Sequence, residues 1–236
     1  IHIEDAIESV SFADEIIVID SFSTDRTVEF AKKHNVVLLQ REFDDFSTQK
    51  NFAIEKATYD WIYILDADER ITLELRKEIL KTVENPKDYV GFNIYRNFYF
   101  IGKRIRFSGF QKDKVVRLFL KNKCKYNGSV VHEKITTKGK VGYLKNKINH
   151  FSYRSLEHFL NKSFLYKRIQ AEQMHLKGEK SNIFKILIKP SARFIKHYII
   201  KLGFLDGFAG FVLSIILAFG VFLRYLKLWL LNNNIK

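Results

Sequence analysis

The sequence is poor in cysteine and lacks export signals and internal repeats. Its 236 residues contain one cysteine, Cys124, which excludes an internal disulfide framework and fits a reducing compartment. No basic segment followed by an apolar stretch and small residues opens the chain, so nothing in it indicates export. Repeats and low-complexity linkers are also absent. With 47 % hydrophobic residues, the chain is long enough for one full-sized domain and a smaller addition.

Acidic residues are scarce in the second part of the chain. Residues 1–95 contain 11 Lys and Arg against 20 Asp and Glu, whereas residues 96–236 contain 29 against 6. The formal net charge of +14 therefore joins an acidic front half to a strongly basic back half. We expect the back half to meet an anionic partner, which is either phospholipid head groups, a phosphorylated lipid or nucleic acid.

A short apolar run followed by two aspartates lies at the centre of the front half. Residues Trp61 to Leu65 are uniformly apolar or aromatic, which is typical of a strand buried on both faces. Asp66 and Asp68 come directly after it, where open α/β sheets bind ligands, and alternate residues of an extended chain point to one side. Paired carboxylates in that position suit a divalent cation that also holds phosphate oxygens. The alternative is that these acids cap the helix expected to start near residue 72.

The rest of the front half alternates strand and helix patterns. Further strands are expected over 15–20 and 36–39, with helices over 25–34, 46–57 and 73–83. This alternation predicts an α/β, Rossmann-like domain over residues 1–152, with a mostly parallel sheet flanked by helices. A mixed or antiparallel section follows, with strands expected over 91–100, 114–120, 129–137 and 140–151.

Residues 153–236 are expected to form a helical, membrane-associating region. A helix is predicted over 155–176, and from 183 to 202 apolar residues alternate with lysines in the pattern of a basic helix lying in a membrane interface. Residues 208–223 carry no charge, but this run is shorter than the ~20 residues that cross a bilayer. We expect attachment to the membrane surface, with a spanning helix or a buried core helix as alternatives.

Six motifs carry a resemblance to a known family. In order and spacing, IVIDSFSTD, QKN and ILDADE (residues 17–25, 49–51 and 64–69) resemble the family 2 inverting glycosyltransferases of the type-A fold. VRLF, YNGSVVHE and GFLDGFAG (residues 116–119, 126–133 and 203–210) are similar to the branch that glycosylates the lipopolysaccharide inner core, which includes β-1,4-glucosyltransferases. The family opens with an apolar strand and a nucleotide-contacting loop, and this sequence starts just after them. An N-terminal truncation is therefore expected.

The resemblance implies a metal-dependent reaction and supplies roles for the two aspartates. A Mg²⁺ or Mn²⁺ ion would neutralise charge on the departing diphosphate of a nucleotide sugar. Asp68 is the expected direct ligand, and Asp66 shares the metal or contacts the ribose. His132 and His150 are candidates for metal or phosphate contact, and a core or capping role is the alternative for each.

Donor contacts are expected from three further residues. Asp20 ends the neighbouring strand, where its carboxylate could accept hydrogen bonds from uracil or ribose, and a turn-forming role is the alternative. Lys50 could pair with the diphosphate as a point charge, unless it is a solvated surface lysine. Asn51 completes the QKN motif and is placed by the resemblance in the nucleotide-binding set.

Inversion by direct displacement requires one general base near the acceptor hydroxyl. Glu133, after His132 in the YNGSVVHE motif, is the expected base, and Asp113 is its rival. The alternative for Glu133 is an ordinary surface position.

These expectations combine into one function and two alternatives. The expected enzyme moves a sugar, most simply glucose, from a nucleotide sugar, expected to be a UDP-sugar, to a lipid-linked anionic glycan such as the lipopolysaccharide inner core. It would work as a peripheral protein on the cytoplasmic face of the inner membrane, without nucleic acid. The alternatives are a basic nucleic-acid-binding protein and an inactive, truncated scaffold.

Overall fold

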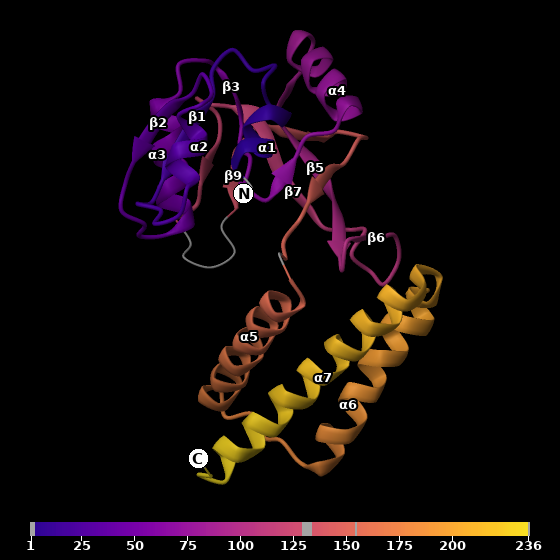
Figure 1. Ribbon diagram of the computed structural model, residues 1–236. Coiled ribbons are helices and arrows are strands. Elements are labelled where there is room, and N and C mark those ends of the chain that lie inside the picture. Colours follow the sequence, from indigo (N-terminus) through magenta and orange to yellow (C-terminus); the bar gives the residue numbers. More distant parts are fainter. Residues whose placement is uncertain (1–2, 129–133, 154, 236) are drawn as a thin grey trace. The chain divides into compact units, whose positions relative to one another are not determined.

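The structure, a computed structural model, describes residues 3–128, 134–153 and 155–235 and divides the chain into two compact units (Figure 1). The first comprises residues 1–96 and 112–150, and the second residues 97–111 and 151–236. The sequence predicted one boundary near residue 152, with residues 97–111 in the front domain. They belong to the second unit because Phe98, Phe100 and Ile105 share a core with the helices of that unit.

The first unit contains four helices among its described residues, each followed by one or more strands. The helices are α1 (Ile3–Ser9), α2 (Thr27–Ala31), α3 (Phe46–Lys56) and α4 (Leu73–Glu84). The strands are β1 (Ile17–Asp20), β2 (Val37–Gln40), β3 (Trp61–Tyr63), β4 (Glu69–Arg70), β5 (Tyr89–Phe100), which runs on into the second unit, β7 (Lys114–Leu120), β8 (Lys125–Tyr126), β9 (Ile135–Thr136), β10 (Lys140–Tyr143) and β11 (Ile148–His150).

The α/β class is confirmed, but the prediction of a mostly parallel sheet is wrong for the described strands. β1 pairs with β2 in parallel, and β10 pairs with β5 in parallel. The larger, seven-stranded sheet runs in the order β3-β7-β5-β11-β4, and its β3–β7, β5–β7 and β11–β4 pairs are antiparallel. The reason is the long strand β5: β7 returns antiparallel to it and inserts between β5 and β3.

Local capping and a shared core fix the elements around the end of β3. The Thr72 hydroxyl accepts a hydrogen bond from the backbone N–H of Leu75 at 3.2 Å, which starts α4. α4 then buries Leu75 and Ile79 against the sheet, together with Phe92 of β5 and Leu118 of β7. This packing holds β3 and β7 side by side, so side chains of β7 reach the turn that follows β3.

The second unit consists of β6 (Lys103–Ile105), paired antiparallel with the end of β5, and a layer of helices. The helical elements are α5 (Leu156–Leu176), α6 (Ile183–Ile195), a π-helical turn (Lys196–Ile200), a 3-10 turn (Gly203–Asp206) and α7 (Gly207–Asn232). α7 packs against both α5 and α6 (Figure 1). Among the described residues, one helical stretch, Gly203–Asn232, is long and apolar enough to cross a membrane, with a mean hydropathy of 2.1 over 18 of its residues.

A buried carboxylate joins the two chain segments of the second unit. Asp206 accepts hydrogen bonds from the backbone N–H groups of Arg106 and Phe107, at 2.8 and 3.0 Å, and from the hydroxyl of Ser108 at 3.2 Å. His197 contacts the carbonyl of Ser108 at 2.8 Å. The GFLDGFAG motif therefore anchors the loop after β6 to the turn between α6 and α7.

Candidate active site

The chain leaves β3 through a tight turn that carries Asp66 and Asp68. The backbone N–H of Ile64 donates to the carbonyl of Arg117 at 2.9 Å, so the chain stays beside β7 after β3 ends. A hydrogen bond from the backbone N–H of Glu69 to the carbonyl of Asp66, at 2.8 Å, closes the turn. The two aspartates thus lie between β3 and β4, at the position that the sequence predicted.

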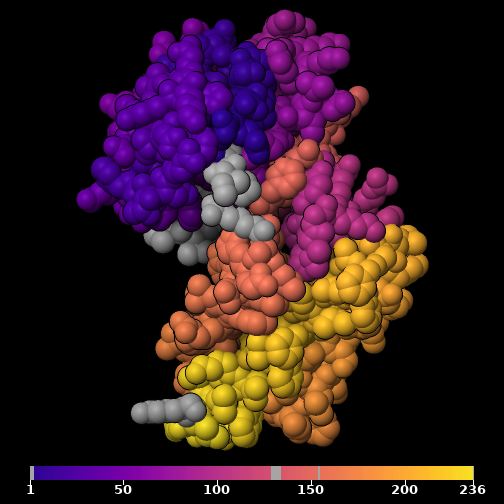
Figure 2. All heavy atoms as spheres, viewed as in Figure 1, coloured from indigo at the N-terminus to yellow at the C-terminus, as the bar shows by residue number. Residues whose placement is uncertain are grey.

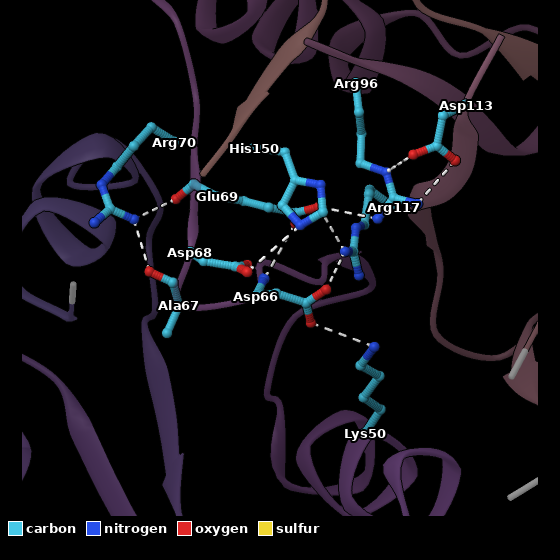
Figure 3. A network of polar contacts seen from close by, with 10 residues as sticks. All are labelled: Lys50, Asp66, Ala67, Asp68, Glu69, Arg70, Arg96, Asp113, Arg117 and His150. Carbon is cyan, nitrogen blue, oxygen red and sulfur yellow. Dashed lines mark hydrogen bonds and ion pairs between the residues drawn. The ribbon is translucent and has the colours of Figure 1, made fainter. Parts of the chain in front are cut away.

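Two cations contact the two carboxylate oxygens of Asp66 (Figure 3). The Arg117 guanidinium donates to Oδ2, and the Lys50 ammonium lies 3.3 Å from Oδ1. Burial alone would raise the pKa of Asp66, but Arg117 and then Lys50 outweigh it and hold the pKa well below its usual range. Asp66 is therefore an ionised, charge-compensated group rather than an open ligand.

Arg117 is itself held by a second buried carboxylate. Its side chain is 3 % exposed, and Nη2 donates to Oε1 of the fully buried Glu69 at 2.7 Å. The Glu69 carboxylate also accepts the backbone N–H of Asp66 at 3.2 Å and lies 3.7 Å from the Arg96 guanidinium. Burial by itself would lower the pKa of Arg117, but Asp66 and Glu69 raise it well above its ordinary value. The guanidinium is therefore a fixed cation between two carboxylates.

Asp68 differs from Asp66 in its surroundings. Its side chain is as exposed as that of Asp66, 36 % for each, but its Oδ2 lies 3.5 Å from Nε2 of His150 at the end of β11. Burial and the nearby Asp66 charge act to raise the pKa of Asp68, whereas contact with His150 lowers it, with a net lowering. The alternative role as a helix cap does not apply, because Thr72 caps α4.

The donor set fits a metal held by one carboxylate better than a shared site. Among the described residues, no three His, Cys, Asp or Glu side chains come together as a metal-binding group. Both oxygens of Asp66 face cations, whereas Asp68 lies beside the imidazole of His150, and the two side chains are equally exposed. Mg²⁺ commonly binds one or two carboxylates and completes its shell with phosphate oxygens and water. Asp68 matches that pattern. His132, the other predicted ligand, lies outside the described residues.

Asp20 organises the loop that follows β1. The carboxylate is buried and accepts the backbone N–H of Ser23, at 3.2 Å to Oδ2, and the side-chain amide of Gln40 at 3.1 Å. Burial alone would raise the pKa of Asp20, and the hydrogen bonds from Ser23 and Gln40 lower it below its usual value. The turn-forming role is present in the structure, and a contact to the donor's base or ribose stays a prediction.

Lys50 and Asn51 lie on α3 and have different partners. Lys50 is 13 % exposed at its side chain, and its ammonium lies 5.3 Å from the ring centroid of Tyr126 as well as beside Asp66. The solvated-surface alternative for Lys50 is therefore wrong. The side-chain amide of Asn51 makes two hydrogen bonds to the backbone of Tyr126. Its oxygen accepts the N–H at 2.9 Å, and its nitrogen donates to the carbonyl at 3.2 Å. Asn51 holds β8 against α3, and a donor contact for it stays a prediction.

The predicted general base, Glu133, lies outside the described residues, as does His132. The backbone on either side is described: the N–H of Asn127 donates to the carbonyl of Lys134 at 3.1 Å, next to the antiparallel pair β8–β9. Because Asn51 fixes β8 beside Lys50, this hairpin starts next to the ion pair of Lys50 and Asp66. The rival base, Asp113, is paired with the Arg96 guanidinium at 2.9 Å.

Sequence reasoning assigned no role to Arg117 or Glu69. A signal for Arg117 was present, because an arginine inside the otherwise apolar run of β7 must find a charged partner when it is buried. Glu69 gave no such signal, since an acid next to a loop is usually solvated. Its burial follows from the pairing of β4 with β11.

Comparisons with known proteins identify the family of the chain. The sequence pattern of the family described as Glycosyl transferase family 2 matches residues 2–162. An uncharacterized glycosyltransferase of Rickettsia prowazekii is 32 % identical over 235 residues, covering 94 % of this chain and 80 % of that protein. The lipopolysaccharide core biosynthesis glycosyltransferase LpsC of Rhizobium meliloti is 26 % identical and covers 94 % of this chain and 85 % of its own.

Among solved structures, S. aureus TarS in complex with UDP-GlcNAc superposes with a TM-score of 0.42 at 15 % identity, covering 98 % of this chain and 87 % of that chain. The match of the family pattern over more than half of the residues, together with the Rickettsia relative, decides the assignment. The chain belongs to glycosyl transferase family 2.

Proposed function

We propose that this chain transfers a sugar, most simply glucose, from a nucleoside diphosphate sugar to a lipid-linked glycan, with inversion at the anomeric carbon. The observation that carries the proposal is the pair of aspartates after β3. One of them contacts two fixed cations, and the other lies beside His150. A carboxylate that can hold a divalent cation and a lysine ammonium near the same turn are groups that bind a diphosphate, which supports the proposal.

Asp68 is the residue proposed to hold Mg²⁺ or Mn²⁺, with Asp66 as a neighbouring acid. The bound cation would supply neutralisation of the charge on the leaving diphosphate. His150, 3.5 Å from Oδ2 of Asp68, orients that carboxylate. Arg117 keeps Asp66 ionised and in place, and is itself held by Glu69, which also contacts Arg96.

Lys50 is proposed as the direct cationic contact to the donor's diphosphate. Its ammonium is aimed into the site, 3.3 Å from Asp66, and its side chain is mostly buried. A lysine held in this way carries a compact, strongly hydrated charge that phosphate oxygens can share. Asp20 and Asn51 are proposed to act near the nucleoside, Asp20 through the loop after β1 and Asn51 through the position of β8.

Glu133 is proposed as the general base that accepts the proton of the acceptor hydroxyl. In direct displacement the acceptor oxygen attacks the anomeric carbon while the bond to the diphosphate breaks, so one base and one leaving-group stabiliser suffice. The strand before Glu133 in the chain, β8, lies beside Lys50, and this neighbourhood supports the choice of Glu133.

The acceptor is proposed to be an anionic, lipid-linked glycan of the lipopolysaccharide inner-core type, used at the cytoplasmic face of the inner membrane. Two observations support this choice. Residues 96–236 carry 29 Lys and Arg against 6 Asp and Glu. LpsC, a relative that covers 94 % of this chain, is named for lipopolysaccharide core biosynthesis. A basic surface of this size attracts phosphorylated glycolipid and anionic lipid alike.

A panel of nucleotide sugars tests the proposal. Purified protein is incubated with UDP-glucose, UDP-galactose, UDP-GlcNAc and GDP- or ADP-linked sugars, with Mn²⁺ or with a chelator, and the released nucleotide diphosphate is measured. We expect metal-dependent release from one UDP-sugar, and faster release when a lipid-linked core glycan is added. Absence of release from every donor, by folded protein in the presence of metal, would contradict the proposed activity.

A further inference from the structure

We propose that the outward faces of α6 and of the first half of α7 form one apolar surface that docks on an anionic phospholipid bilayer, with α6 lying in the plane of the membrane. This inference rests on the proposed membrane location and assigns it to particular residues. The outer face, as we define it, consists of Phe184, Leu187, Ile188, Ile195 and Ile199 from α6 and the π-helical turn, and Phe208, Phe211, Ile215 and Phe219 from α7.

The side of α6 that faces away from α7 is apolar. At about 100° per residue, Phe184, Ile188 and Ile195 fall within about 40° of one another around the helix. These side chains are 68, 59 and 50 % exposed, whereas Ile186 and His197 on the opposite side are buried. A surface helix of a soluble protein normally turns its polar side outward. The exposed apolar side of α6 therefore needs an apolar environment.

Aromatic rings join the exposed side of α6 to that of α7. The Phe194 and Tyr198 rings contact the Phe211 ring, with centroid distances of 6.2 and 5.6 Å. On α7, the exposed residues 208, 211, 215 and 219 repeat at helical spacing and make one stripe. Figure 2 shows α7, in yellow, reaching the surface of the helical unit beside α6. The apolar surface is thus continuous across two helices and larger than isolated exposed residues would be.

The charges around this surface favour an anionic bilayer as the partner. Lys185, Lys189 and Lys196 follow one another at helical spacing along one edge of the apolar side of α6. Residues 181–235, all of them described, contain a single acid, Asp206, which is buried and bonded to backbone N–H groups. Lysines at such an edge can keep their ammonium groups at the level of lipid phosphates while their stems stay in apolar surroundings.

The same contacts argue against two other arrangements. α5 packs along α7, and its outward side carries the exposed charges of Glu157, Lys162 and Arg168. If α7 crossed the bilayer, these charges would be drawn into hydrocarbon at high cost. If a second copy covered the outer face, the lysines of each copy would meet the same region of the other copy. That region has no exposed acid to pair with them, so the lysines of the two copies would repel one another.

Co-sedimentation with vesicles tests the docking surface on the full chain. Vesicles are made from phosphatidylcholine alone or with phosphatidylglycerol, and no donor is added. The outer-face variant is Ile188→Glu with Ile195→Glu. The control, Leu165→Glu with Ile169→Glu, adds the same charge at exposed apolar positions of α5. Thermal unfolding by circular dichroism checks that both variants are folded.

We expect wild-type protein to bind the phosphatidylglycerol vesicles, the outer-face variant to bind at least about tenfold more weakly, and the control to bind like wild type. Replacement of Lys185, Lys189 and Lys196 by Gln should remove the preference for phosphatidylglycerol. Alkaline carbonate should release the bound protein, as it releases proteins that lie on a membrane.

Four results would overturn the docking surface. They are equal binding by wild type and the outer-face variant, an equal loss in the control, retention of the protein after carbonate extraction, and a dimer in solution that does not bind vesicles. Nucleotide-sugar turnover is measured on the same preparations. Protein that binds vesicles as described but releases nucleotide from no donor would contradict the proposed enzyme and leave the docking surface standing.

Discussion

At the scale of single residues, Arg117 connects the two carboxylates that shape the site. Its guanidinium contacts Asp66 on one side and Glu69 on the other, and its side chain is almost fully buried. Taking Arg117 and Glu69 out of water is costly, and the cost is offset only while the two charges remain in contact. Removal of one member leaves an uncompensated charge in the interior.

The first prediction concerns this network. Arg117→Met should lower the free energy of unfolding by about 3–5 kcal/mol, because Glu69 would be left buried without its main partner. Arg26→Met provides a control, since Arg26 forms a solvent-exposed pair with Glu29 at 2.8 Å, and its loss should change the free energy of unfolding much less. Denaturant titration of both variants measures the difference. Similar losses for the two variants would mean that Arg117 is not held as described.

The second prediction concerns the general base. Glu133→Gln should lower kcat by about 10² or more, because the amide cannot accept the acceptor's proton, while donor affinity stays the same. Single-turnover kinetics and nucleotide titration separate the two effects. A loss of donor affinity with unchanged kcat would place Glu133 in the nucleotide pocket instead.

The sequence was informative for some residues of the site and silent for others. Spacing alone placed Asp66 and Asp68 just after a strand, and the structure has them there, but the expectation of a strand buried on both faces is wrong, because only Ile62 of β3 is buried. The partners of Asp66 could not be deduced, because Arg117 is 51 positions away and meets it only through the pairing of β3 with β7. Charge pairing of this kind depends on strand order, which local patterns do not encode.

At the scale of elements, segments with strong caps or periodicity were predicted well. The helix expected over 73–83 is α4, capped by Thr72, and the strand expected over 114–120 is β7 with the same bounds. The helix expected over 25–34 is confined to Thr27–Ala31, which has no side-chain cap at its start. Strand direction was predicted less well, because parallel and antiparallel neighbours leave similar apolar patterns in short buried strands.

The turn between α6 and α7 leads to the third prediction. Asp206→Ala should destabilise the helical unit by about 2–4 kcal/mol, because the N–H groups of Arg106 and Phe107 would lose a charged acceptor in a buried position. Asp206→Asn keeps one acceptor oxygen and should cost less. Thermal unfolding followed by circular dichroism ranks the variants. Equal stability of wild type and Asp206→Ala would show that the carboxylate does not hold this turn.

A buried histidine in the same region gives the fourth prediction. Burial is the main cause that lowers the pKa of His197 below its ordinary value of 6.5, and the neighbouring Lys201, Arg193 and Lys196 act in the same direction. As pH falls through 6.5, the unfolded chain gains a proton that the folded protein resists, so stability is lost toward acid pH and is fully present above that value.

We therefore expect wild type to lose more stability than His197→Gln between about pH 8 and about pH 5. Urea unfolding at the two pH values provides the comparison. If both proteins lose the same amount, the pH dependence comes from other groups.

At the scale of the whole molecule, the division of the chain could not be foreseen. The fall in acidic residues after residue 95 was visible in the sequence, and it coincides with the start of residues 97–111, which belong to the helical unit. That excursion is a hairpin whose aromatic residues, Phe98 and Phe100, pack in one core with Phe159 of α5. A hairpin in a run of strands gives no local sign that its core lies in another unit.

The sequence shows that the excess of basic residues lies in the second half of the chain, but this excess alone does not distinguish a lipid partner from a nucleic acid. A basic nucleic-acid-binding protein was one alternative. Membership of glycosyl transferase family 2 now gives the front unit a different role. The basic residues of α6 lie along the edge of an apolar face, as in a lipid-binding helix.

The most direct test of the central claim is the dependence of nucleotide affinity on metal. UDP binding is measured by isothermal titration calorimetry, with Mn²⁺ and with a chelator, for wild type, Asp68→Asn and Asp113→Asn. Asp113 is the matched control, because it is another partly exposed carboxylate of the first unit, and it is paired with Arg96. The account predicts that Mn²⁺ raises the affinity at least about tenfold in wild type and in Asp113→Asn but has no effect in Asp68→Asn. Metal dependence that survives in Asp68→Asn, or equal affinity with and without Mn²⁺ in wild type, would contradict it.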